Sequence, residues 1–115
     1  MAIPSGSGTE VLKRVFDDET GTGETTLITG VANHIYTILS VIVCSRMTGS
    51  ETFSLYIDYN AGGTDLYLLD VTPITAKGTF VFSDKFILTG TDKLHCTGSA
   101  TGYDVWCTYI DQDWT

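Results

Sequence analysis

The side chains that a catalytic site would draw on are few in this sequence. They are two histidines, His34 and His95, and three cysteines, Cys44, Cys96 and Cys107. His95 and Cys96 are adjacent, and neighbours on a strand point to opposite faces, so these two cannot hydrogen-bond directly. A catalytic triad needs a nucleophile, a base and an acid that meet in space, and the chain has no G-x-S-x-G motif to supply the nucleophile. We therefore expect no enzyme and no catalytic residues.

The cysteine spacing argues against both zinc and disulfides. The sequence contains no C-x-x-C pair, so it does not predict a tetrahedral zinc site. We expect Cys96 and Cys107 to flank a hairpin, at positions where a disulfide between them would be strained. The sequence thus predicts three free thiols in a protein made in a reducing compartment.

Two acidic segments are candidates for binding calcium, which prefers carboxylate and carbonyl oxygens. One is the run Asp17–Glu19 with Glu24 close behind it, and the other is the loop 58–65. Neither has the D-x-D-x-D-G spacing of a calcium loop. The alternative is loop charge that serves solubility. We expect no bound metal and no cofactor.

Hydrophobic residues alternate with a period of two along almost the whole chain, and no window has the spacing of an amphipathic helix. The pattern predicts an all-β, antiparallel sandwich that is jelly-roll-like, with about eight strands and no significant helix. Residues 1–9 are expected to form a flexible N-terminal arm, and residues 10–115 a single domain. The expected strands cover residues 10–16, 25–30, 34–44, 52–59, 65–71, 79–82, 85–90, 92–98 and 103–110.

Some connections can be predicted as well. The turn 60–63 closes a hairpin between 52–59 and 65–71. The strand 34–44 is expected to be central and to contain a twist or bulge. Only Ser83 and Asp84 separate the strands 79–82 and 85–90, so the chain should turn a corner or kink there. The last two strands are expected to form a hairpin around residues 99–102.

The charge balance excludes some partners. Six Lys and Arg against fourteen Asp and Glu give a net charge of −8 over 115 residues. Such a surface repels phosphate, so we expect no binding to nucleic acid or membrane.

Aromatic residues are too numerous for the core of a small domain, with five Phe, six Tyr and two Trp. We expect Tyr56, Tyr67, Tyr109 and Trp114 at a subunit interface, where such residues are enriched. The alternative is that exposed rings stack on sugars, as in a lectin-like module.

Two segments, residues 52–69 and 85–111, resemble the small all-β virion structural proteins of tailed bacteriophages, particularly those of cyanophages. The similarity lies in Phe86-Ile-Leu88, Gly90, Asp92-Lys-Leu94 and Val105-Trp-Cys-Thr-Tyr109-Ile-Asp111, together with the opening MAIPSGSGTEVLKR. In this pattern Phe86–Leu94 is a strand pair with a tight turn at Gly90.

The resemblance implies a virion structural protein without catalytic residues. The leading hypothesis is a capsid decoration (cement) protein that binds the outer surface of the major capsid protein and stabilises the shell. Such a protein is expected to be a homotrimer, made in the host cytoplasm and located on the capsid surface. The alternative is a tail, knob or fibre module that binds host-surface glycans.

Deleting residues 1–9 should weaken binding to capsids without unfolding the domain. The reason is that the arm, around Ile3 and Pro4, is expected to reach a neighbouring subunit while contributing nothing to the core. Capsid co-sedimentation and thermal unfolding of the full-length and truncated chains measure the two effects. Unchanged capsid binding would contradict a role for the arm.

Overall fold

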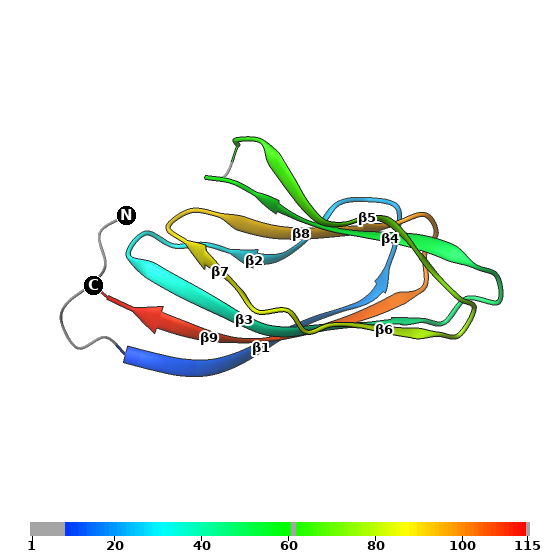
Figure 1. Cartoon of the computed structure of the whole chain (residues 1–115), viewed down its shortest axis with the longest axis horizontal. Coiled ribbons are helices and arrows are strands. Elements are labelled where there is room, and N and C mark those ends of the chain that lie inside the picture. Colours follow the sequence, from blue (N-terminus) through cyan, green and yellow to red (C-terminus); the bar gives the residue numbers. More distant parts are fainter. Residues whose placement is uncertain (1–8, 61, 115) are drawn as a thin grey trace.

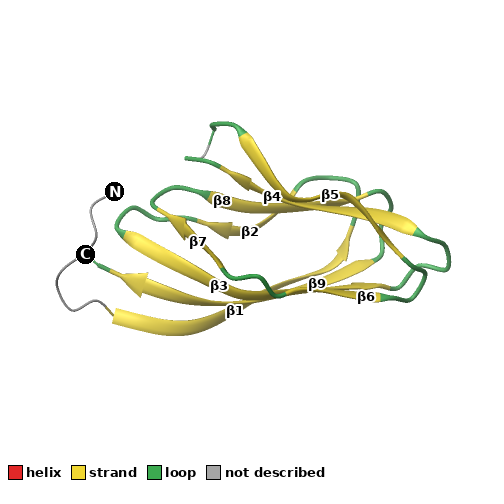
Figure 2. Ribbon diagram, viewed as in Figure 1, coloured by secondary structure: helices red, strands yellow, loops and turns green. Residues whose placement is uncertain are grey.

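A computed structural model of the chain describes residues 9–60 and 62–114, and Ile3 and Pro4 lie outside these. The described residues form nine strands and no helix (Figures 1 and 2). All pairings are antiparallel, so the expected all-β sandwich is confirmed. The strands are β1 (Thr9–Thr20), β2 (Thr25–Thr29), β3 (His34–Ser45), β4 (Glu51–Asp58), β5 (Asp65–Ile74), β6 (Thr79–Phe82), β7 (Phe86–Thr89), β8 (Lys93–Gly98) and β9 (Tyr103–Asp113).

The strands form two sheets with jelly-roll connectivity. Sheet A has the order β1-β9-β3-β6, with β7 also paired to β3, and sheet B has the order β2-β8-β4-β5. Strands β6 and β7 pair with successive halves of β3, so they act as one strand interrupted at residues 83–85. At Ser83 and Asp84, where a corner or kink was expected, the chain is interrupted but keeps its direction along β3 and turns no corner. Counted in this way, eight strands form the two four-stranded sheets of a jelly roll.

Two expected strand pairs are wrong. Strand β8 lies between β2 and β4 in sheet B, whereas β9 lies between β1 and β3 in sheet A, so residues 99–102 connect the two sheets and do not close a hairpin. The same holds for Phe86–Leu94: Gly90 has a left-handed φ of 61°, but β7 and β8 belong to different sheets. Alternation with a short turn fits a hairpin and a connection between sheets equally well, because both place one face of each strand on the core.

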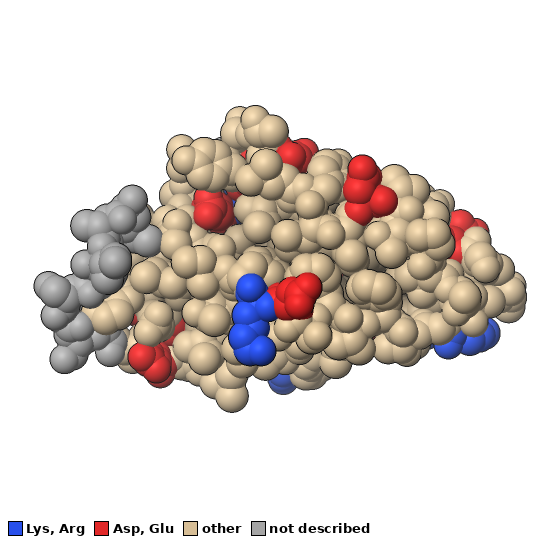
Figure 3. Space-filling view, viewed as in Figure 1, with Lys and Arg blue, Asp and Glu red and all other residues tan. Residues whose placement is uncertain are grey.

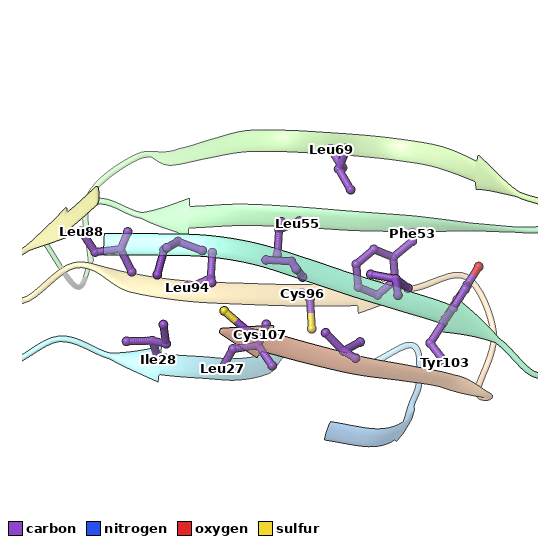
Figure 4. Packing of buried hydrophobic residues seen from close by; sticks show 14 of the residues in the cluster. Leu27, Ile28, Phe53, Leu55, Leu69, Leu88, Leu94, Cys96, Tyr103 and Cys107 are labelled. Atoms are coloured by element: carbon purple, nitrogen blue, oxygen red, sulfur yellow. The ribbon is translucent and has the colours of Figure 1, made fainter. Parts of the chain in front are cut away.

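The core lies between the sheets and is filled by alternate residues of each strand (Figure 4). Strand β4 turns Phe53 and Leu55 inward, as its alternation predicts. The largest of the fully buried side chains are Tyr103, Phe53, Ile38, Leu55, Leu88 and Leu94.

Cys96 and Cys107 enter this core from opposite sheets and do not flank a hairpin. Both are fully buried, and burial raises the pKa of each thiol to about 12. Packed sheets lie about 10 Å apart, whereas a disulfide needs Cα atoms roughly 5.5–6 Å apart. All three cysteines are free, and these two pack as small hydrophobic residues.

The bulge expected in β3 is present. The register between β3 and β9 shifts between Ile38 and Ser40. Before the shift the inward residues include Tyr36 and Ile38, and after it they include Val41 and Val43. The bulge thus changes which alternate residues of β3 face the core, and it turns Ile42 toward the outer face of sheet A.

An ionic cluster lies on sheet A where β1, β3 and β9 run side by side. Asp111 is 6% exposed, and both of its carboxylate oxygens are used: Oδ2 is 2.8 Å from Lys13 Nζ, and Oδ1 is 2.8 Å from His34 Nδ1. Burial alone would raise the pKa of Asp111. The hydrogen bonds to Lys13 and His34 outweigh it and hold that pKa below its ordinary value.

Replacing Asp111→Asn should lower the free energy of unfolding by about 1–3 kcal/mol at neutral pH, because a charged partner of Lys13 is lost. A carboxylate with a lowered folded-state pKa stabilises the fold above its unfolded pKa of about 3.9 and stops doing so as the pH falls through the folded value. The gap between the two proteins should therefore close in acid. Urea unfolding from neutral to acidic pH measures it, with the exposed Asp70→Asn as control. A gap that does not change with pH would contradict the assignment.

Candidate interaction surface

A row of large apolar side chains crosses the outer face of sheet A. Phe16 pairs with Trp106, Trp106 with Ile42, and Ile42 with Val81, so the row spans β1, β9, β3 and β6. Their exposed fractions are 56%, 41%, 37% and 52%. A sheet face that meets only water normally carries polar residues. We call these four residues the outer apolar row.

Stacked rings and a cation fix one end of the row. The rings of Phe16 and Trp106 are nearly parallel, with centroids 5.6 Å apart. The Arg14 guanidinium lies 5.0 Å from the Trp106 centroid and 5.6 Å from that of Phe16, which are cation–π distances. The rings therefore stay in place at the surface without being buried. Trp and Arg side chains of this kind carry much of the binding energy in protein interfaces.

A shallow cavity of about 300 Å³ borders the row. Phe16, Ile42, Cys44 and Trp106 form its apolar wall, and Asp18 and Asp104 add carboxylates at its margin. Asp104 is paired with Arg46 Nε at 3.0 Å, while Asp18 is exposed. The cavity therefore combines an apolar wall with an acidic rim.

The outer face of sheet B is built differently, around a buried histidine. His95 is 4% exposed, and its Nδ1 lies 3.0 Å from Thr26 Oγ1. Its Nε2 lies 3.7 Å from both Glu24 Oε1 and Asp58 Oδ2. The Tyr56 hydroxyl donates to Glu24, and burial together with this hydrogen bond raises the pKa of Tyr56 far above its ordinary value. These groups form a polar network around His95, with Glu24 and Thr26 at its exposed margin.

The residues expected at a subunit interface lie in several places. Tyr67 is 52% exposed and stacks on Tyr56 at 4.9 Å, but Tyr56 itself is buried in the network of sheet B. Tyr109 is partly buried and packs 6.1 Å from Tyr36. The Trp114 backbone N–H donates to Asn33 O at 3.0 Å. The structure brings together only Tyr56 and Tyr67, and the interface role of all four residues stays a prediction.

Sequence reasoning missed the outer apolar row, although a signal for it was present. Trp106 lies between Val105 and Cys107, and alternation sends its ring to the face opposite theirs. On β1 the same argument places Leu12, Arg14 and Phe16 on one face. Only the register of β1 with β9 shows that Phe16 and Trp106 meet.

The acidic segments do not converge. Asp17 accepts a hydrogen bond from Thr20, Glu19 pairs with Arg46 at 3.1 Å, and Glu24 bonds to Tyr56. Among the described residues, no group of three or more His, Cys, Asp or Glu side chains is placed to hold a metal ion. Within the same part of the chain, no helix is long and apolar enough to cross a membrane.

Comparisons with known proteins relate the chain through its fold. No family model and no curated protein matches the sequence. A subunit from a structure described as "Bacillus endospore appendages form a novel family of disulfide-linked pili" aligns with 100% of this chain and 97% of its own, with a TM-score of 0.57 and 16% identity. The VP2 subviral particle of infectious bursal disease virus aligns with 91% of this chain, with a TM-score of 0.56 and 12% identity.

What these proteins share with the chain is the fold. The chain spans about a third of the length of the infectious bursal disease virus chains, at 31–33%, and nearly the whole Bacillus subunit.

In Figure 3 acidic side chains are scattered over the face in view and most of that face is uncharged.

Proposed function

We propose that this chain is a virion structural protein and not an enzyme, and specifically a capsid decoration (cement) protein of a tailed bacteriophage. It would bind the outer surface of the major capsid protein as a homotrimer, after synthesis in the host cytoplasm. The observation that carries the proposal is the outer apolar row of sheet A with its acidic-rimmed cavity.

The composition of this face suits a protein partner. Contiguous exposed apolar residues mark interaction sites more often than isolated ones. Here the row is continuous across four strands, and stacking with Arg14 fixes its aromatic end. A preorganised face loses little entropy on binding, which raises affinity.

The charge of the face favours a shell protein over a second copy as its occupant. A second copy docked face to face would bring its own Asp18 against the same rim. Like charges placed across an interface oppose association. The complementary partner has an apolar centre flanked by basic groups, and we assign that role to the major capsid protein.

The structural neighbours support a role in assembly. One is a Bacillus pilus subunit of nearly the same length, and others come from infectious bursal disease virus particles. The fold is therefore suited to building extended particles without a catalytic site. A rigid jelly roll offers the same surface at every lattice position, so weak contacts add up over many copies.

Replacing Trp106→Ala should weaken binding to undecorated capsids of the same phage by about 10- to 100-fold, the usual effect of removing an interface hot spot. Co-sedimentation over a range of protein concentrations measures it. Leu66→Ala is the matched variant, because it removes a large exposed apolar side chain from β5 of sheet B. If Leu66→Ala weakens binding and Trp106→Ala does not, the docking face is on sheet B and the assignment to sheet A is wrong.

Cys44 gives a second readout of the same face. Its partly exposed thiol lines the cavity beside Trp106, so alkylation by iodoacetamide should slow when the protein is bound to capsids. Cys96 and Cys107 are internal controls, since their buried thiols with raised pKa should stay unmodified in both states. Equal alkylation of Cys44 in the free and bound protein would contradict docking through this face.

The free protein should have a native mass near three times 12.5 kDa, and a calcium chelator should leave it unchanged. Closed symmetric assemblies are the rule for homo-oligomers, and a trimer matches threefold positions of a capsid lattice. Light scattering after size exclusion measures the mass with and without chelator. A stable monomer would contradict the homotrimer. It would not contradict docking through sheet A, which the capsid-binding experiments test separately.

A further inference from the structure

A second cavity, of about 390 Å³, lies at the end of the sandwich where three loops meet. These are the β2–β3, β4–β5 and β7–β8 connections, at the left of Figure 1. The cavity shares no lining residue with that of the outer apolar row. Its polar and aromatic lining consists of Asn33, Tyr59, Asn60, Thr89, Thr91 and Asp92.

Asp92 ties the three loops together. Its Oδ1 accepts the backbone N–H of Asn60 at 2.9 Å, and its Oδ2 accepts that of Thr89 at 3.1 Å. Its backbone carbonyl accepts the N–H of Gly30 at 2.9 Å. The Asp92 carboxylate is thus occupied by the protein itself. The cavity wall is fixed before any ligand arrives.

Tyr59 supplies an exposed ring. It is 58% exposed, and no other described aromatic side chain stacks on it. A Cβ added to Gly63 would lie 3.2 Å from Tyr59 Cδ1, so the ring rests close to the glycine backbone of its own hairpin. Glycine at this position lets the ring lie against the loop, and the ring becomes a platform at the edge of the cavity.

Several polar groups of the lining are unused by the rest of the described chain. The Asn33 side-chain amide and the Thr89 hydroxyl make no hydrogen bond to a described residue, and the Asn60 amide nitrogen donates none. The Asn60 Oδ1 accepts the Thr91 hydroxyl at 2.8 Å, which orients that amide and leaves its N–H groups free to donate. The lining therefore offers donors and acceptors together beside an exposed ring.

The lining has the wrong charge for an anionic ligand and too many polar groups for an apolar one. The described residues around the cavity include the Asp92 carboxylate and no lysine or arginine, so phosphate and carboxylate ligands find no cationic partner. A ligand that suits amides, hydroxyls and one aromatic ring is uncharged, carries many hydroxyl groups and has an apolar C–H face. Sugars have this chemistry.

We propose that the cavity bordered by Asn33, Tyr59 and Asn60 binds a neutral saccharide, with one sugar ring on Tyr59 and its hydroxyls on the two asparagine amides. This site is separate from the docking face of sheet A. A virion protein bound to a shell through sheet A would carry the sugar site at one end of its sandwich.

The test is a titration of the full-length protein with sugars, in which binding is monitored through the backbone amide NMR signals. The probes are glucose, galactose, mannose, N-acetylglucosamine and their neutral trisaccharides, with sialyllactose as the anionic comparison. We expect at least one neutral sugar to shift the signals of residues 33, 59–60 and 89–92 with a Kd near the millimolar range. Tyr59→Ala and Asn33→Asp should each weaken that binding about tenfold.

Tyr67→Ala is the matched control, since it removes an equally exposed tyrosine outside the cavity. The Asn33→Asp variant should fold normally, because Asn33 is exposed and Asp tolerates its left-handed φ of 66°. The proposal is overturned if no neutral sugar shifts these signals, if Tyr67→Ala weakens binding as much as Tyr59→Ala, or if sialyllactose binds through its charge more tightly than the neutral sugars. Trp106→Ala should leave the sugar titration unchanged, which separates this result from the capsid experiments.

Discussion

Strand β3 is the element on which the two-sheet arrangement depends. It pairs with β9 over nearly its whole length and with β6 and β7 on its other side, so most of sheet A is assembled on it. Strict alternation along its twelve residues would place Ile38 and Val41 on opposite faces of sheet A. The bulge between Ile38 and Ser40 resolves this, because it places Ile38 and Val41 on the same, inward side.

The two outer faces of the sandwich differ in chemistry. On sheet B polar side chains gather around the buried His95: Thr26 is within hydrogen-bond distance, and Glu24 and Asp58 lie 3.7 Å away. On sheet A the outer apolar row is continuous across four strands, and Arg14 packs on its two rings. A partner therefore gains more by covering sheet A, where apolar surface leaves water, than by covering the central part of sheet B, where polar groups would have to be desolvated.

Local pattern was enough to predict much of the fold. Alternation on β4 gave its inward residues, the turn before β5 gave a hairpin, and the short gap at Ser83 gave the interruption between β6 and β7. The partners of β8 and β9 were not predictable in this way, because a strand's neighbours depend on contacts far along the chain. The same limit applies to the interaction surface: alternation gives the face on which Trp106 lies, but only the β1–β9 register places Phe16 beside it.

The interruption between β6 and β7 also bears on solubility. Open sheet edges invite further strands, and a sheet grows into a fibre only if both of its edges accept them. Sheet A has the long β1 on one side, but its other side is divided into two pieces of four residues each, with an interruption between them. In sheet B the edge strand β5 contains Pro73, which has no N–H to donate, and its pairing with β4 shifts register twice. Each sheet therefore has one edge that is poorly suited to pairing with a further strand, which disfavours strand-by-strand aggregation.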